Sequence, residues 1–207
     1  MAEGSRRRNL ILAGALLALL LAGAGAGAFA LSGRDSGREN GAESEKSHYG
    51  LTAPKRLAGG YVRHGTVQST AVSVVPPDGT TPQGIRVERE VSANYENGSS
   101  ILDLDGAWGD VYDPGAAVDA TMARVQKTGI DAVAAPRLFK PKGLSSDVVV
   151  KCVELKLGPF RMLECAWADA DTVGRLSVMP KGGSTRLEDV AQLTARVWQQ
   201  ARVVING

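Results

Sequence analysis

Hydrophobic and polar residues alternate over much of the chain after residue 57, and this alternation predicts β-strands. The alternating segments are separated by turn sequences such as PPDG and ENG, and they lie at residues 61–75, 85–95, 100–108, 148–157, 160–168 and 173–179. A period of two is expected where one face of a strand packs on a core. The pattern therefore predicts an antiparallel sheet.

Two further segments have hydrophobic residues at helical spacing. The first begins at Asp113, a favourable N-cap residue, with Pro114 at the first helical position and Gly129 as a natural stop. The second opens with Thr185 and Glu188, which have the spacing of a capping box, and continues as an apolar stripe. Strands and helices that are segregated in this way predict an α+β class with two helices packed on the sheet. Their order also suggests two similar β-β-β-α halves.

The longest apolar run in the chain is Leu10–Leu31, 22 residues without a charge, directly after a short segment that ends in Arg6–Arg8 and Asn9. It is long enough to span a bilayer as a helix, and the arginines place residues 1–9 in the cytoplasm. A cleavable signal peptide remains an alternative, because AGA and AFA in this run match a cleavage pattern. The first interpretation predicts a single-pass membrane protein and the second a secreted soluble one, and both export the rest of the chain.

Residues 32–56 are rich in Ser, Gly and charged residues and nearly lack apolar side chains. Such a segment cannot offset the entropy of ordering, so it predicts a disordered tether in which His48 is solvated. The folded domain is then expected at 57–207. That part contains 16 Lys and Arg against 17 Asp and Glu, a net charge of −1. A domain without a basic face lacks the electrostatic footprint of nucleic-acid binding, and we exclude that class.

The chain contains only two cysteines, Cys152 and Cys165. Gly158 and Pro159 predict a two-residue turn, and counting outward from it places the cysteines opposite one another, with α-carbons about 4.5 Å apart. That distance is near the short end of the range that a disulfide accepts. In an exported domain we expect this pair to be oxidised. Redox and zinc sites need other spacings and more ligands, so we predict no cofactor and no metal.

Acidic and aromatic residues gather at two predicted turns, DLDGAWGDVYD and WADADT. They could line a ligand groove, since binding sites combine aromatic rings with a few polar groups. The groove would consist of Trp108, Asp110, Tyr112, Trp167, Asp169 and Asp171. The alternative is that the aromatics fill the core and the aspartates form turns. No catalytic motif is present, and His64 lacks partners for a Ser/His/Asp set, so we predict no catalytic residue.

An RRR-led Ala/Leu/Gly segment, a polar tether and the motifs LAGGYV, GAWGDVYDP and ECAWADADTVGRLSV occur together. This combination resembles uncharacterised single-pass envelope proteins of streptomycete-type actinobacteria over most of the chain. The resemblance implies a membrane-tethered extracytoplasmic domain and no known activity. We therefore expect a non-enzymatic, monomeric module that binds an envelope protein or a small ligand. The alternative is a hydrolase that uses the acidic clusters, with Asp103, Asp105, Asp169 and Asp171 as its carboxylates.

Overall fold

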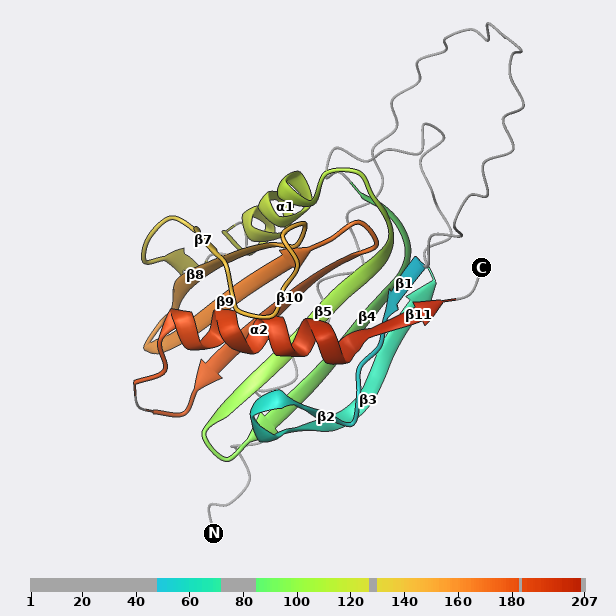
Figure 1. Ribbon diagram of the computed structural model, residues 1–207. Helices are drawn as coiled ribbons and strands as arrows, with labels where there is room; N and C mark the ends of the chain where they lie inside the picture. The colour runs from blue at the N-terminus through green and yellow to red at the C-terminus, as the bar shows by residue number, and fades with distance from the viewer. Residues whose placement is uncertain (1–47, 72–84, 127–129, 183, 206–207) are drawn as a thin grey trace, which may run out of the picture. The chain divides into compact units, whose positions relative to one another are not determined.

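The computed structural model describes residues 48–71, 85–126, 130–182 and 184–205 (Figure 1). Contacts divide the chain into Met1–Glu43 and Ser44–Gly207, and every described residue belongs to the second unit. This unit is a mostly antiparallel sheet with two helices, which confirms the α+β class. The predicted anchor at 10–31 lies outside the described residues. Within the described ranges, no helix is both long enough and apolar enough to span a membrane.

Two three-stranded meanders form the body of a sheet that contains nine of the described strands. The meanders lie side by side because β5 pairs antiparallel with β10, from Ser100 opposite Pro180 to Trp108 opposite Thr172. The first comprises β3 (Tyr61–Ala71), β4 (Ile85–Asn97) and β5 (Ser100–Val111), and the second β8 (Val149–Leu157), β9 (Phe160–Ala168) and β10 (Thr172–Pro180). The edges are extended by β2 (Arg56–Leu57) next to β3, and by β6 (Asp131–Ala132) and β7 (Arg137–Phe139) next to β8.

A helix follows each meander, and the two helices cover opposite faces of β9. On one face, Met162 and Ala166 share a core with Val118 of α1 (Pro114–Gln126). On the other face, Leu163 shares a second core with Trp198 of α2 (Leu187–Ala201), the red helix in the front of Figure 1. Strand β9 is therefore buried on both faces, which explains its nearly continuous apolar sequence.

The predicted start of α1 is confirmed. The Asp113 carboxylate accepts a hydrogen bond of 2.9 Å from the backbone N–H of Ala116, and Pro114 is the first helical residue. This bond satisfies one of the amide donors that have no partner within the helix. The predicted stop at Gly129 lies outside the described residues.

The predicted capping box of α2 is displaced by one residue. The N-cap is Arg186 instead of Thr185, and its backbone N–H donates to the Asp189 carboxylate at 3.2 Å. The side chain of Glu188 turns outward and accepts a hydrogen bond from Arg137 at 2.8 Å. The ion pair with Arg137 of β7 draws Glu188 away from the helix start, and the next acidic residue, Asp189, caps the helix instead.

The described domain begins earlier than the predicted boundary at residue 57. Strand β1 (His48–Leu51) pairs antiparallel with β11 (Arg202–Ile205), which follows directly after α2. Leu51 is buried in the same core as α2. The prediction of a disordered tether was therefore wrong for residues 48–56, because a four-residue strand has no periodic signal of its own and is fixed by a partner at the other end of the chain.

The β8–β9 hairpin has the register that the turn predicts. Leu157 lies opposite Phe160, and Cys152 lies opposite Cys165. The two cysteines form a disulfide with α-carbons 4.0 Å apart, somewhat closer than the predicted 4.5 Å. Both are fully buried in the core beneath α2. The predicted disulfide is therefore confirmed, and it connects two neighbouring strands inside the core.

Candidate ligand-binding site

A pocket of about 330 Å³ lies where the β1–β11 ribbon meets the ends of β4 and β5 and the turn after β9. Its lining residues are His48, Tyr49, Arg86, Glu88, Trp108, Gly109, Asp110, Asp171 and Ile205. We call it the Trp108 pocket. It contains three of the six residues of the predicted groove, and they come from both of the acidic turn sequences.

The pairing of β5 with β10 brings these two sequences together. Beyond the last strand pair, the Gly109 N–H donates to the Asp171 carbonyl at 3.0 Å, and the Val111 N–H donates to the Ala170 carbonyl at 3.0 Å. Gly109 has a φ of +150°, and a β-carbon there would lie 2.0 Å from the carbonyl oxygen of Arg86. Only glycine allows this close approach of β4, which brings Arg86 into an ion pair with Asp110.

Asp169 lies behind the pocket and holds its turn in place. The carboxylate is buried and accepts four hydrogen bonds: from the backbone N–H groups of Asp171 and Thr172 at 2.9 and 2.8 Å, from the Thr172 hydroxyl at 2.8 Å, and from the Trp198 indole N–H at 2.6 Å. Such a carboxylate has little capacity left for a ligand. Asp169 therefore positions Asp171 and connects the turn to α2.

Arg202 completes this support from the end of α2. Its guanidinium contacts two aromatic rings, 3.5 Å from the Tyr49 centroid and 4.8 Å from the Trp198 centroid. It also forms ion pairs with Asp169 at 3.7 Å and Asp171 at 3.5 Å. A planar cation can stack and pair at the same time, which partly compensates the buried carboxylate. Arg202 was not predicted from the sequence; its only local signal is a cation at a helix C-terminus, where the dipole favours one.

Most charged groups in the pocket are paired. Arg86 pairs with Asp110, and the His48 Nδ1 lies 3.3 Å from a carboxylate oxygen of Asp171. The side chain of His48 is 58% exposed, so the expected solvation holds in part. Glu88 is the lining carboxylate without a partner among the described residues, and it points to solvent.

Two other residues of the predicted groove lie elsewhere. Trp167 is fully buried beneath α2, where Gly174 leaves room for its ring: a β-carbon at Gly174 would lie 2.1 Å from it. Trp167 thus fills the core, which was the alternative interpretation. Tyr112 is 53% exposed and does not line the pocket. Strand alternation explains this, because the odd-numbered positions of β9 point towards α2.

Asp103 and Asp105 lie on the face of the sheet opposite to the one that α2 covers. Asp105 accepts hydrogen bonds from Ser92 at 2.7 Å and from Arg175 at 2.5 Å. The pKa of Asp103 is raised by burial and, to a lesser extent, by the neighbouring Asp105. In the strand register, Asp103 of β5 lies opposite Ser177 of β10, and Ser177 is six residues after Asp171 in the chain. At the rise of a strand this separation is about 20 Å, so the two acidic clusters do not converge.

The same face buries Glu164, which the sequence analysis did not consider. Its side chain is inaccessible to solvent, and burial raises its pKa to about 7. Ser177 donates to one carboxyl oxygen at 3.1 Å, and the other oxygen has no partner in the described part of the chain. A lone Glu within the apolar strand sequence MLECAWA was the available signal.

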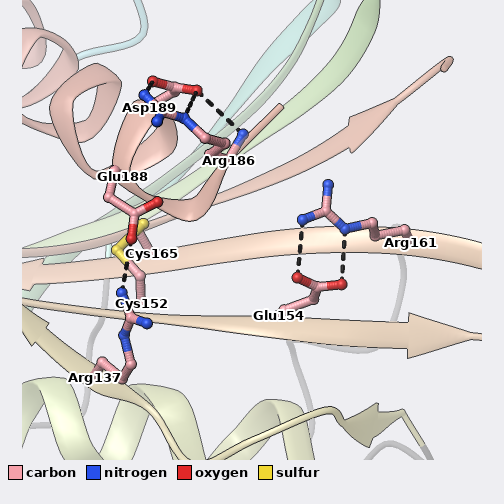
Figure 2. A network of polar contacts seen from close by, with 8 residues as sticks. All are labelled: Arg137, Cys152, Glu154, Arg161, Cys165, Arg186, Glu188 and Asp189. Atoms are coloured by element: carbon pink, nitrogen blue, oxygen red, sulfur yellow. Dashed lines mark hydrogen bonds and ion pairs between the residues drawn. A yellow bond between two sulfur atoms is a disulfide. The ribbon is translucent and has the colours of Figure 1, made fainter. Parts of the chain in front are cut away.

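A second pocket, of about 300 Å³, lies at the N-terminus of α2. Figure 2 shows the polar contacts of its charged residues and the nearby disulfide. Its arginines all have acidic partners. Arg161 forms two hydrogen bonds with Glu154, at 2.7 and 2.8 Å, and these lower the pKa of Glu154. Arg137 binds Glu188 at 2.8 Å, and Arg186 binds the Asp189 carboxylate at 3.3 Å. This pocket therefore offers no surplus charge and no exposed aromatic ring for a ligand.

Comparisons of the chain with protein-family models, with curated proteins and with solved structures found no match. Within the described ranges, no group of three or more His, Cys, Asp or Glu residues is placed to hold a metal ion. The function therefore has to be argued from the site itself.

Proposed function

We propose that this chain is a membrane-tethered extracytoplasmic module that binds a small ligand in the Trp108 pocket and catalyses no reaction. The observation that carries the proposal is the convergence of Trp108, Asp110 and Asp171 in one pocket, where the polar side chains are held by ion pairs. A concave site with an aromatic ring and a few fixed polar groups is typical of small-molecule binding. Its concave shape favours a small ligand over a protein partner.

The disulfide and the N-terminal sequence support the location. A buried disulfide is consistent with an oxidising compartment outside the cytoplasm. If the apolar segment 10–31 is not cleaved, it would anchor the domain in the membrane. The 16 residues from 32 to 47 would then limit the distance between the domain and the membrane to about 55 Å. Cleavage within that segment would give a secreted protein with the same pocket. The resemblance to actinobacterial envelope proteins favours the anchored form.

The arrangement of the carboxylates argues against the alternative of a hydrolase. A pair of catalytic carboxyl groups works at about 5 to 10 Å, whereas Asp103 and Asp171 are about 20 Å apart along the sheet. Asp169 is occupied by its four hydrogen bonds. Of the three carboxylates that line the Trp108 pocket, Asp110 and Asp171 are both paired with cations, and Glu88 is exposed.

Tryptophan fluorescence of the full chain tests the proposal. Of the three tryptophans, Trp167 and Trp198 are 0% and 8% exposed, so Trp108 should account for most of the quenching by acrylamide. Trp108→Phe should remove the quenchable component and thereby validate the readout. We expect a small-molecule fraction of the cell envelope to protect Trp108 in protein purified from membranes.

Matched aspartate variants provide the control. Asp171→Asn should abolish the protection, whereas Asp103→Asn, on the other face of the sheet, should leave it intact. Equal loss in both variants, or no protection by any fraction, would refute ligand binding at this pocket. Recovery of the bound molecule in hydrolysed form would instead establish the hydrolase.

A further inference from the structure

We infer that the Trp108 pocket takes a neutral, hydroxyl-rich ring, that is, a sugar or a sugar-like polyol. This inference rests on the proposed function and specifies its ligand class. The size of the pocket is the first argument. At about 330 Å³ it is at the lower end of the range for small-molecule sites, so it suits one ring better than an extended chain.

The aromatic lining is the second argument. The Arg202 guanidinium lies 3.5 Å from the centroid of the Tyr49 ring, and Trp108 is the other aromatic residue of the lining. Arg89 lies 5.7 Å from the Trp108 centroid and leaves the indole partly exposed. An indole offers a broad apolar face with a negative π-system, against which the polarised C–H groups of a saturated ring can pack.

The balance of charge is the third argument. Arg86 neutralises Asp110, and Arg202 lies against Asp171 from behind the pocket. An anionic ligand would meet the carboxylates of Glu88, Asp110 and Asp171. A cationic ligand would have to compete with a bound arginine at Asp110 and Asp171, and among the described residues it would find an unpaired lining carboxylate only at the exposed Glu88. Breaking such a pair leaves a charge uncompensated, which costs more than a new pair gains. The pocket therefore favours an uncharged ligand.

The remaining hydrogen-bonding capacity is the fourth argument. An arginine has five N–H donors and a carboxylate about four acceptor sites, and one ion pair uses only part of them. The His48 Nε2 is also free of described partners. The lining thus offers both donors and acceptors. A hydroxyl group both donates and accepts, so a ring with several hydroxyls matches this arrangement.

Four probes distinguish the ligand classes: glucose and N-acetylglucosamine as neutral sugars, choline as a cation and citrate as an anion. The full chain is kept in a polyoxyethylene detergent, whose headgroup resembles none of them. Protection of Trp108 from acrylamide gives the affinity, and a single sugar ring is expected to bind at about millimolar concentration. Asp110→Asn should weaken the binding of the sugar about tenfold by removing charge-assisted acceptors, and Asp103→Asn should not change it.

The outcomes separate the inference from the proposed function. Tighter binding of choline or citrate than of both sugars, lost in Asp110→Asn, would refute the ligand class and leave a small-molecule pocket in place. Failure of both sugars at about 100 mM, well above the expected dissociation constant, would also overturn the inference. The proposed function would then be tested only by whether the envelope fractions protect Trp108 from acrylamide. Sugar binding that is indifferent to both Asp110→Asn and Asp171→Asn would refute both.

Discussion

Replacing Glu164 by Gln should stabilise the domain at alkaline pH and leave it nearly unchanged at acidic pH. Glu164 lies in the middle of β9 and is fully buried. One carboxyl oxygen accepts a single hydrogen bond from Ser177, and the other has no partner within the described residues. Arg175 attracts the carboxylate, but its guanidinium is bound to Asp105. The fold thus buries a carboxyl group whose charge is poorly compensated.

The size of the effect follows from the pKa. Burial raises the pKa of Glu164 from 4.5 to about 7, and the attraction of Arg175 opposes this only in part. Between these values the folded protein keeps a proton that the unfolded chain has released. The free energy of unfolding therefore falls as the pH rises through this window, by about 3 kcal/mol in total at 1.36 kcal/mol for each unit of pKa. The amide of the Glu164→Gln variant cannot ionise, so the variant does not lose this part of the free energy of unfolding.

Urea unfolding of Ser44–Gly207 with its disulfide intact provides the measurement. The contributions of titrating groups far from Glu164 cancel when the variant is compared with the wild type at the same pH. The stability advantage of Glu164→Gln should grow by about 3 kcal/mol between pH 4.5 and pH 8. The control is Glu88→Gln, which removes an exposed carboxylate and should change stability by less than about 0.5 kcal/mol at either pH.

The opposite sign would refute the reasoning. If the wild type gains stability over Glu164→Gln as the pH rises, the carboxylate is charged in the folded state and its attraction to Arg175 exceeds the cost of burial. A change of less than about 1 kcal/mol between the two pH values would likewise show that the side chain is solvated well enough to keep an ordinary pKa.

Three other changes test the core and the support of the pocket. Exported, unreduced protein should show no free thiol, and replacing both Cys152 and Cys165 by Ala should lower the free energy of unfolding in urea by about 2 to 3 kcal/mol. Gly174→Ala should cost about 2 kcal/mol or more in the same assay, because the new methyl group would lie 2.1 Å from the Trp167 ring; an unchanged midpoint would mean that the ring moves aside at no cost. Arg202→Ala should cost about 3 kcal/mol, and Arg202→Lys should recover only part of this because lysine keeps the charge but cannot stack as a plane. Full recovery by lysine would show that the charge alone matters.

The six long strands were predictable because turn sequences separate them and, apart from the nearly continuous apolar β9, each shows its own alternation. Structure and prediction agree closely for β4, β5, β8, β9 and β10. The short strands β1, β2, β6, β7 and β11 were not predicted. They contain two to four residues each, too few to show a period, and exist because a longer strand or a terminal partner offers hydrogen bonds. Local sequence determines the centre of the sheet, and long-range pairing determines its margins.

The disulfide could also be predicted from local sequence, whereas the pocket depends on long-range pairing. The register of Cys152 and Cys165 follows from a turn only a few residues away, so counting was sufficient. The pocket joins β5 to the β9–β10 turn and then to the β1–β11 ribbon. The sequence supplied Trp108, Asp110 and Asp171, but Tyr49 was assigned to a tether because nothing near it in the chain predicts a strand.

Asp169 and Asp171 show why residue type alone could not separate support from site. They are two positions apart and chemically identical, yet Asp169 is buried with four hydrogen bonds and Asp171 lines the pocket. The difference comes from the end of α2. Trp198 in its last turn and Arg202, four residues later at the start of β11, bring an indole N–H and a guanidinium to the same carboxylate. The packing of α2 thus sets the position of Asp171, although the helix itself does not line the pocket. A change in the α2 core should therefore affect binding even without contact with the ligand.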